Sequence, residues 1–246
     1  MSRDARSSGR EFLAIARQLI ERLELEEWEN ISAAAVCVAD ALEGGHSIHA
    51  FGTGHSHMLA EELFYRAGGL VQVKPILFEG LMLHASAPLS TSLERLDGLA
   101  AALLKDHPIA LGDVLIVASN SGSNAVTSEL VQLVKELGVT SIALTSLHHA
   151  MSTSARSTKL PRLHELADIV IDNGGAVGDA AIAVDGFDKR IAPTSTIVGA
   201  AILNTIVAEA VQLLIERGVR PEVYSSSNLD GGDKANANYV AKGLAR

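Results

Sequence analysis

Residues 114–124 contain the feature that most limits the possible folds: an apolar strand pattern that runs directly into a loop of small polar residues. The strand residues are Val-Leu-Ile-Val-Ala, the loop is Ser-Asn-Ser-Gly-Ser-Asn, and a helical pattern begins beside Asn124. The first N–H groups of a helix have no partner within the helix, and the helix dipole is positive at that end. The sequence therefore predicts an anion-binding turn in which Ser119, Ser121 and Asn124 supply donors.

An earlier junction has the same design. His49-Ala50-Phe51 is followed by Gly52-Thr53-Gly54-His55-Ser56 and then by an apolar stripe at helical spacing. Ligands of open α/β sheets bind where the carboxyl ends of neighbouring strands meet. Two such turns predict one phosphorylated ligand that lies across two strand ends. The alternative is that these polar residues only form turns and helix caps.

Short apolar segments alternate with helical segments along the chain. Strands are expected at 47–51, 70–73, 114–118, 141–144 and 169–171, with a further candidate at 181–184, and helices within 11–42 and at 56–67, 93–104, 125–137 and 196–215. Continuously apolar strands are typical of a parallel sheet that is covered on both faces. The sequence therefore predicts an α/β fold, namely a three-layer α/β/α sandwich around a mostly parallel five-stranded sheet.

Three parts of the chain are expected to differ in role. Residues 1–43 form an N-terminal helical extension, 44–218 the core domain and 219–246 a C-terminal tail. The N-terminal helices are amphipathic, so their apolar faces need a cover, either the core or a second subunit, and we expect a homodimer or homotetramer. The irregular segments 75–92, 146–163, 173–193 and 224–237 are expected to form walls or lids of the site.

Composition disfavours several classes of protein. The formal net charge of −9 argues against a nucleic-acid binder. Cys37 is the only cysteine and can form no disulfide within the chain, which suits the cytoplasm, and it is expected to be inert. Residues 1–10 are polar and unlike a leader, and polar residues interrupt the longest apolar run, 197–215, so no membrane span is expected.

Three motifs taken together resemble the sugar isomerase (SIS) domain, which has a flavodoxin-like fold. They are the turn at 52–56, the loop at 119–124, and Pro-Thr-Ser-Thr at 193–196, where the last long helix begins. Proteins with this domain include phosphoheptose isomerase, glucosamine-6-phosphate synthase, the N-acetylmuramic acid 6-phosphate etherase and sugar-phosphate-sensing regulators. The stretches 81–84, 172–175, 178–181 and 227–233 resemble, more closely, a bacterial SIS family of phosphosugar-binding proteins.

The resemblance implies a small-molecule sugar phosphate as the ligand. Many relatives have Thr or Ser at the position of Asn124, whose amide can also donate. Ser195 and Thr196 would contact the sugar. The remaining phosphate- or sugar-binding candidates belong to the two turns: Gly54, Ser56, Ser119, Asn120, Ser121, Gly122, Ser123 and Asn124.

Isomerisation between aldose and ketose needs a base and an acid, usually a carboxylate and an imidazole. Glu61 and Glu62 follow the first turn in Ala-Glu-Glu-Leu. This stretch is similar to the one that carries the catalytic glutamate of phosphoheptose isomerase. In this chain it lies about one helical turn nearer to the glycines of the first turn. His55, His57 and His84 are candidate acids. Solvated or structural roles remain the alternative for these residues. The histidine that phosphoheptose isomerase uses near the last helix is absent.

No cofactor or metal is expected. The pairs His55/His57 and His148/His149 lack the i, i+4 spacing with which one helix presents two metal ligands, and the acidic stretch 230–233 is too short for an EF-hand loop. Three functions remain open: a phosphosugar isomerase, a sugar-phosphate-sensing module without chemistry, and a lyase that resembles the etherase.

Overall fold

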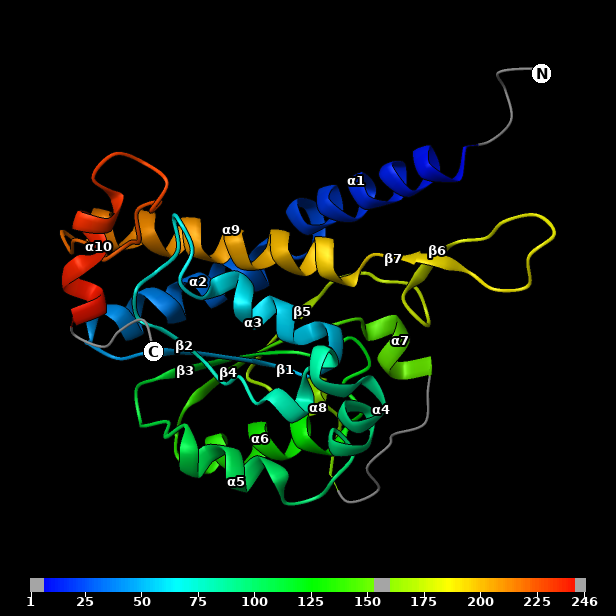
Figure 1. Ribbon diagram of the computed structural model, residues 1–246, viewed down its shortest axis with the longest axis horizontal. Helices are drawn as coiled ribbons and strands as arrows, with labels where there is room; N and C mark the ends of the chain where they lie inside the picture. Colours follow the sequence, from blue (N-terminus) through cyan, green and yellow to red (C-terminus); the bar gives the residue numbers. More distant parts are fainter. Residues whose placement is uncertain (1–6, 153–159, 242–246) are drawn as a thin grey trace.

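A fully parallel sheet of five strands forms the middle layer of the computed structural model, which describes residues 7–152 and 160–241 (Figure 1). The strands are β1 (Ile48–Gly52), β2 (Val73–Pro75), β3 (Val114–Ala118), β4 (Thr140–Thr145) and β5 (Ile169–Asp172). Their spatial order is β2-β1-β3-β4-β5, the order of flavodoxin-like folds. The predicted fold class, a three-layer α/β/α sandwich, is therefore confirmed.

Helices cover both faces of the sheet (Figure 1). One face carries α2 (Trp28–Glu43), α3 (His57–Leu63) and α9 (Ser195–Glu216), and the other carries α5 (Leu99–Asp106), α6 (Ala125–Glu136) and α8 (Leu163–Leu166). The first helix, α1 (Ser8–Glu26), lies against α9 and extends beyond the sandwich. The expected N-terminal helices therefore exist, and both contact the core.

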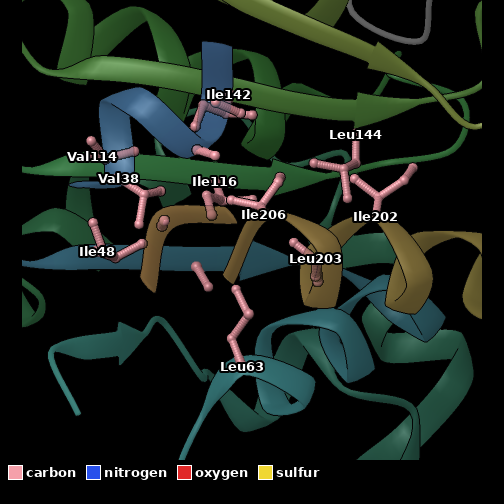
Figure 2. Packing of buried hydrophobic residues seen from close by; sticks show 14 of the residues in the cluster. Val38, Ile48, Leu63, Val114, Ile116, Ile142, Leu144, Ile202, Leu203 and Ile206 are labelled. Atoms are coloured by element: carbon pink, nitrogen blue, oxygen red, sulfur yellow. The ribbon is translucent and has the colours of Figure 1, made fainter. Parts of the chain in front are cut away.

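Alternate strand residues supply two separate hydrophobic clusters. In β3, Val114 and Ile116 pack in the cluster under α2, α3 and α9, whereas Leu115 and Val117 pack in the cluster under α5 and α6. This is the two-residue repeat of a strand with both faces buried. Figure 2 shows the first cluster, in which Ile206 of α9 lies beside Ile116 of the sheet and Ile202 of α9 lies beside Leu144.

The structure differs from the expected elements at four places. The helix expected at 56–67 is α3, which ends at Leu63 because Phe64 is extended (φ −94°, ψ 134°). The strand expected at 70–73 is displaced, because Leu70 pairs antiparallel with Val223 and β2 begins only at Val73. The helix expected at 93–104 is α5 alone, preceded by Gly98 in the left-handed region (φ 86°). The strand expected at 181–184 is β6 (Ala180–Ile182), which leaves the main sheet and pairs antiparallel with β7 (Ile191–Pro193).

The segments expected to be irregular contain short helices. Segment 75–92 holds the 3-10 helix η2 (Glu79–Leu81) and most of α4 (Leu83–Leu93), and segment 146–163 holds α7 (Leu147–Ser152). The C-terminal segment 224–237 leads into α10 (Gly232–Ala241). These elements surround the carboxyl ends of the strands, except for α10, which lies at the opposite end of the molecule beside the C-terminal end of α9 (Figure 1).

Within the described residues, α9 is the one helix that has the length and the apolar composition to cross a membrane, with a mean hydropathy of 1.8. In this helix, 39% of the apolar window is buried. The buried face, which includes Val198, Ile202 and Leu214, packs on α2, α3 and the sheet. Cys37 of α2 is half-buried, and burial raises the pKa of its thiol, which fits the expected inert role.

Candidate functional site

The two turns identified in the sequence lie side by side. β1 and β3 are neighbours, with Gly52 opposite Ala118 at their carboxyl ends, and the chain order reverses between them because β2 lies beyond β1 and β4 beyond β3. In open α/β sheets this topological switch point is where ligands bind. The candidate site is therefore the crevice above the ends of β1 and β3.

The first turn depends on a glycine for steric reasons. A Cβ atom at Gly52 would lie 2.3 Å from the carbonyl oxygen of Ser56, so the chain can fold back over the end of β1 only with glycine at this position. The turn continues into the 3-10 helix η1 (Gly54–Ser56), and Thr53 Oγ1 donates to Glu94 Oε2 at 2.8 Å. This turn places Ser56 at the crevice.

Hydrogen bonds between residues of the second turn stabilise part of it. The buried Ser119 accepts a hydrogen bond at Oγ from the Gly122 N–H (3.2 Å), and Ser123 Oγ donates to Ser121 Oγ (3.2 Å). Gly122 lies in the left-handed region, with φ 55°. The turn-forming role that the sequence allows for these residues is therefore real for Ser119 and Ser123. Since a hydroxyl that accepts a bond can also donate one, this role leaves Ser119 able to bind a ligand.

Other groups of the second turn have no protein partner. Among the described residues, the N–H groups of Ser121, Ser123, Asn124 and Ala125 donate to no acceptor, whereas the Val126 N–H donates to the Glu94 carbonyl at 3.2 Å. Asn124 is the N-cap of α6, but its side chain makes no cap hydrogen bond. Several backbone donors and a positive dipole end therefore converge beside the carboxyl end of β3.

A small pocket opens between this crevice and the start of α9. It holds only about 10 Å³ of space, room for about one water molecule. A sugar therefore requires these walls to separate or has to lie further out. The residues that line the pocket are Ser56, Leu59, Ala118, Ser119, Asn120, Leu144, Asn173, Ser195, Thr196 and Gly199.

Asn173, which sequence reasoning missed, joins β5 to the second turn. Its Nδ2 donates to Asn120 Oδ1 at 2.9 Å, its Oδ1 accepts from the Gly175 N–H at 2.9 Å, and the residue is buried. The available signal was its position in the stretch 172–175, directly after an apolar strand. The two amides form one wall of the pocket.

The side chain of Asp179, a residue that sequence reasoning also missed, lies at the N-terminus of α9. Its carboxylate accepts from the N–H groups of Thr194 (3.1 Å) and Ser195 (2.9 Å) and from Ser195 Oγ (2.6 Å). An anionic side chain is favourable at this end of a helix. The Ser195 hydroxyl is therefore engaged by the protein, while Thr196 lines the pocket with no such bond to Asp179.

The candidate acid–base residues fall into two groups. His57 is buried, its Nδ1 is bonded to the Gly54 carbonyl, its Nε2 lies 3.7 Å from Glu61 Oε2, and its ring is 6.1 Å from that of His84. Because a carbonyl can only accept, Nδ1 carries a proton, and Nε2 is the atom left for proton transfer. The structure thus brings His57, Glu61 and His84 together.

The other group lies away from this cluster. Glu62 pairs with Arg66 and accepts from Asn204 Nδ2 of α9 at 2.8 Å. His55 is exposed in the turn. No three His, Cys, Asp or Glu side chains in the ranges 7–152 and 160–241 are placed to hold a metal ion.

Comparison with known proteins relates this geometry to a family. The family model described as "SIS domain" matches residues 11–146, more than half of the chain. A UPF0309 protein of Geobacillus sp. (strain WCH70) is 44% identical over 225 residues, which cover 90% of this chain and 91% of the relative. A UPF0309 protein of Listeria innocua serovar 6a is 41% identical over 231 residues, which cover 94% of each chain.

Solved structures share the fold at much lower identity. The phosphoheptose isomerase of Francisella tularensis aligns with a TM-score of 0.54 and 15% identity, covering 82% of this chain and 96% of that one. The phosphoheptose isomerase of Neisseria gonorrhoeae aligns with a TM-score of 0.52 and 16% identity, covering 82% and 94%. From the family match, the close relatives and the shared fold, we conclude that the chain belongs to the SIS domain family and to the UPF0309 proteins.

Proposed function

We propose that this protein binds a small phosphorylated sugar above the carboxyl ends of β1 and β3. The observation that carries the proposal is the set of backbone donors at Ser121, Ser123 and Asn124, which meet no acceptor in the described part of the chain and lie at the topological switch point of the sheet. The phosphate would accept from these N–H groups and from the hydroxyls of Ser119 and Ser56, and Gly54 would let the first turn approach closely. Membership of the SIS family supports this ligand class.

The sugar would extend from the phosphate over the small pocket. Asn120, Asn173 and Thr196 line it and offer amide and hydroxyl groups of the kind that bind sugar hydroxyls. Since the pocket has room for about one water molecule, we expect the start of α9 to move away from the second turn when the ligand binds.

Isomerisation is the reaction we propose for the bound sugar. The Glu61 carboxylate would remove the proton from C2 of the open-chain aldose and return it to C1, and His57, through Nε2, would take the proton of the C2 hydroxyl and give it to the carbonyl oxygen at C1. His84, whose ring contacts His57, would shape this side of the site. Glu62 is less suited to be the base because Arg66 and Asn204 already hold it.

The adjacent glutamates provide a matched pair for the test. Hexose, heptose and amino-sugar phosphates are screened first for a rise in melting temperature and then for exchange of the C2 proton in deuterated water. Glu61→Gln should reduce exchange about 1000-fold, the scale of general acid–base catalysis, and Glu62→Gln should reduce it far less. If ligands raise the melting temperature but no proton exchanges, the protein is a sensor; loss of exchange in Glu62→Gln alone would contradict the assignment of the base.

We also propose that the protein is a homodimer, or a homotetramer built from such dimers. A groove of about 510 Å³ between α1, α2 and α9 is lined by Ile20, Leu23, Trp28, Ile31 and Ala201, and Leu13 and Leu25 of α1 are exposed. A second copy would cover this apolar surface. Light scattering coupled to size exclusion should show an oligomer that Ile20→Asp dissociates and Arg10→Asp, an exposed control at the start of α1, does not; a monomeric wild type would refute the proposal.

A further inference from the structure

A second pocket lies at the other end of α3. It holds about 250 Å³ and is formed by the turn 65–67, the segment 224–228 and Asn236 of α10. Helix α3 begins beside Ser56, at the crevice, and ends at Leu63, just before this pocket. The two sites are therefore separated by the length of α3, and this pocket is independent of the proposed sugar-phosphate site.

Hydrogen bonds to backbone groups hold the walls of the second pocket in place. The Gly68 N–H donates to the Tyr224 carbonyl at 2.9 Å, and the Tyr224 N–H donates to the Gly69 carbonyl at 3.0 Å. The buried Asn236 side chain bonds both the N–H and the carbonyl of Ser225, each at 2.9 Å. The pocket is consequently a built feature of the fold, and the segment 224–228 is fixed on both sides.

The chemistry of the lining fits an oxyanion. Of the residues in 7–152 and 160–241 that line the pocket, Arg66 is the only charged one. The hydroxyls of the serines at 225–227 and the amide of Asn228 accompany it, and no carboxylate from these ranges does. Arg66 uses Nη1 to pair with Glu62, which leaves guanidinium N–H groups for another acceptor. Arginine beside several neutral donors is a typical arrangement for phosphoryl and carboxylate groups.

Two features of this pocket are energetically unfavourable. The Tyr224 hydroxyl is buried and, in the part of the chain that the structure describes, has no hydrogen-bond partner. Tyr65 has φ 43°, a conformation that bulky side chains rarely adopt. Buried polar groups without partners and strained residues both occur preferentially at binding sites. A ligand oxygen bonded to Tyr224 would satisfy the hydroxyl.

We infer that this pocket is a second binding site, which takes a small hydroxylated molecule through its phosphoryl or carboxylate group. The oxyanion binds Arg66 and the serine hydroxyls, and the remaining hydroxyl groups reach Asn228 and Tyr224. The molecule competes with Glu62 for the Arg66 guanidinium.

The tyrosines allow a test that reports on this pocket alone. The chain has three tyrosines. Tyr65 and Tyr224 line the pocket, with ring centroids 5.0 Å apart, and Tyr239 packs against Tyr224, with ring centroids 5.7 Å apart. In the full chain labelled with 3-fluorotyrosine, the fluorine NMR signals can be followed during titration with inorganic phosphate and, separately, with malonate. Sodium chloride at the same ionic strength is the reference.

We expect a saturable shift of the Tyr65 or Tyr224 signal with at least one probe. Arg66→Gln should raise the half-saturating concentration about tenfold or more, while Arg220→Gln, an exposed arginine outside the pocket, should leave it unchanged. Ser121→Ala should also leave it unchanged, which separates this site from the proposed sugar-phosphate site. The inference is overturned if both probes act only like sodium chloride, if Arg66→Gln keeps the half-saturating concentration of the wild type, or if Ser121→Ala abolishes the saturable shift.

Discussion

The hydrogen bonding of polar groups differs between the amino ends and the carboxyl ends of strands β1 and β3. At the amino ends, the buried Asp113 accepts hydrogen bonds from the Ser47 N–H (2.9 Å), the Ala110 N–H (3.0 Å) and the His49 ring (3.1 Å). At the carboxyl ends, the N–H groups of Ser121, Ser123 and Asn124 meet no acceptor among the described residues. Paired groups stabilise a fold, whereas unpaired donors in a crevice are available to a ligand.

This difference assigns stability to one end of the sheet and binding to the other. Variants at the amino ends should lower the free energy of unfolding and leave the affinity for sugar phosphates intact. Variants at the carboxyl ends should do the reverse. Each of the following variants tests whether stability and binding are assigned to opposite ends of the sheet in this way.

The largest effect is expected for Asp113→Ala. This change leaves two N–H groups and the His49 ring without their acceptor, and we expect it to lower the free energy of unfolding by about 3 kcal/mol. Denaturant unfolding measures the loss. Asp106→Ala, at a carboxylate whose side chain is 87% exposed, is the matched control and should change stability by less than about 0.5 kcal/mol. An equal effect of the two variants would remove the basis for the comparison.

Ser121→Ala should have the next largest effect, but on binding. Loss of a hydroxyl that donates to a dianion should weaken sugar-phosphate affinity about tenfold, which corresponds to about 1.4 kcal/mol. Titration calorimetry measures this change, and Ser152→Ala, an exposed serine at the end of α7, is the control. Stability should be nearly unchanged. A variant that unfolds more easily and binds as before would reverse the assignment of the two ends.

Asn173→Ala tests a residue that belongs to both functions. It removes the hydrogen bonds to Asn120 and Gly175, so we expect a loss of about 1 kcal/mol in unfolding free energy together with a few-fold loss in affinity. Denaturant unfolding and calorimetry on the same preparation measure both. A loss of stability with full affinity would make the amide pair purely structural.

The smallest effect is the response of stability to acid. Burial lowers the pKa of His49, against the opposing effect of Asp113. The folded state therefore binds fewer protons than the unfolded state, and stability should fall as the pH drops below about 6.5, the ordinary histidine pKa. Unfolding midpoints at pH values above and below this point measure the slope, which His49→Gln should reduce. A slope that His49→Gln leaves unchanged would contradict this origin.

Asp113 extends the same trend to lower pH. Burial alone would raise the pKa of its carboxyl, but the N–H groups of Ser47 and Ala110 and the His49 ring hold the pKa below its ordinary value. Stability from this group is present above the unfolded pKa of about 3.9 and is lost as the pH falls through the lower, folded value. The two groups therefore act in successive pH ranges.

The sequence predicts those elements that local pattern determines. The apolar run 114–118 forms β3 with the bounds that the sequence predicts, because a strand buried on both faces has to be continuously apolar. Leu70 was placed in a parallel strand because its neighbours are apolar, and its antiparallel partner Val223 is far away in sequence. Pairings between such distant segments leave no local pattern that distinguishes them.

The same limit applies to the candidate site. The turns at 52–56 and 119–124 were found because each follows its own strand and precedes its own helix. Asn173 and Asp179 were missed because their roles depend on Asn120 and on the start of α9, which only the folded chain brings to them. Likewise, neither glutamate of α3 could be preferred from the sequence, since Asn204 of a distant helix is what holds Glu62.

The central claim is that the N–H groups of the turn before α6, which meet no acceptor among the described residues, bind the phosphate of a sugar phosphate. A crystal structure of the complex tests it most directly. We predict phosphate oxygens within about 2.7–3.2 Å of the backbone nitrogens of Ser121 and Ser123. A sugar phosphate bound elsewhere, with these nitrogens still facing only solvent, would contradict the account.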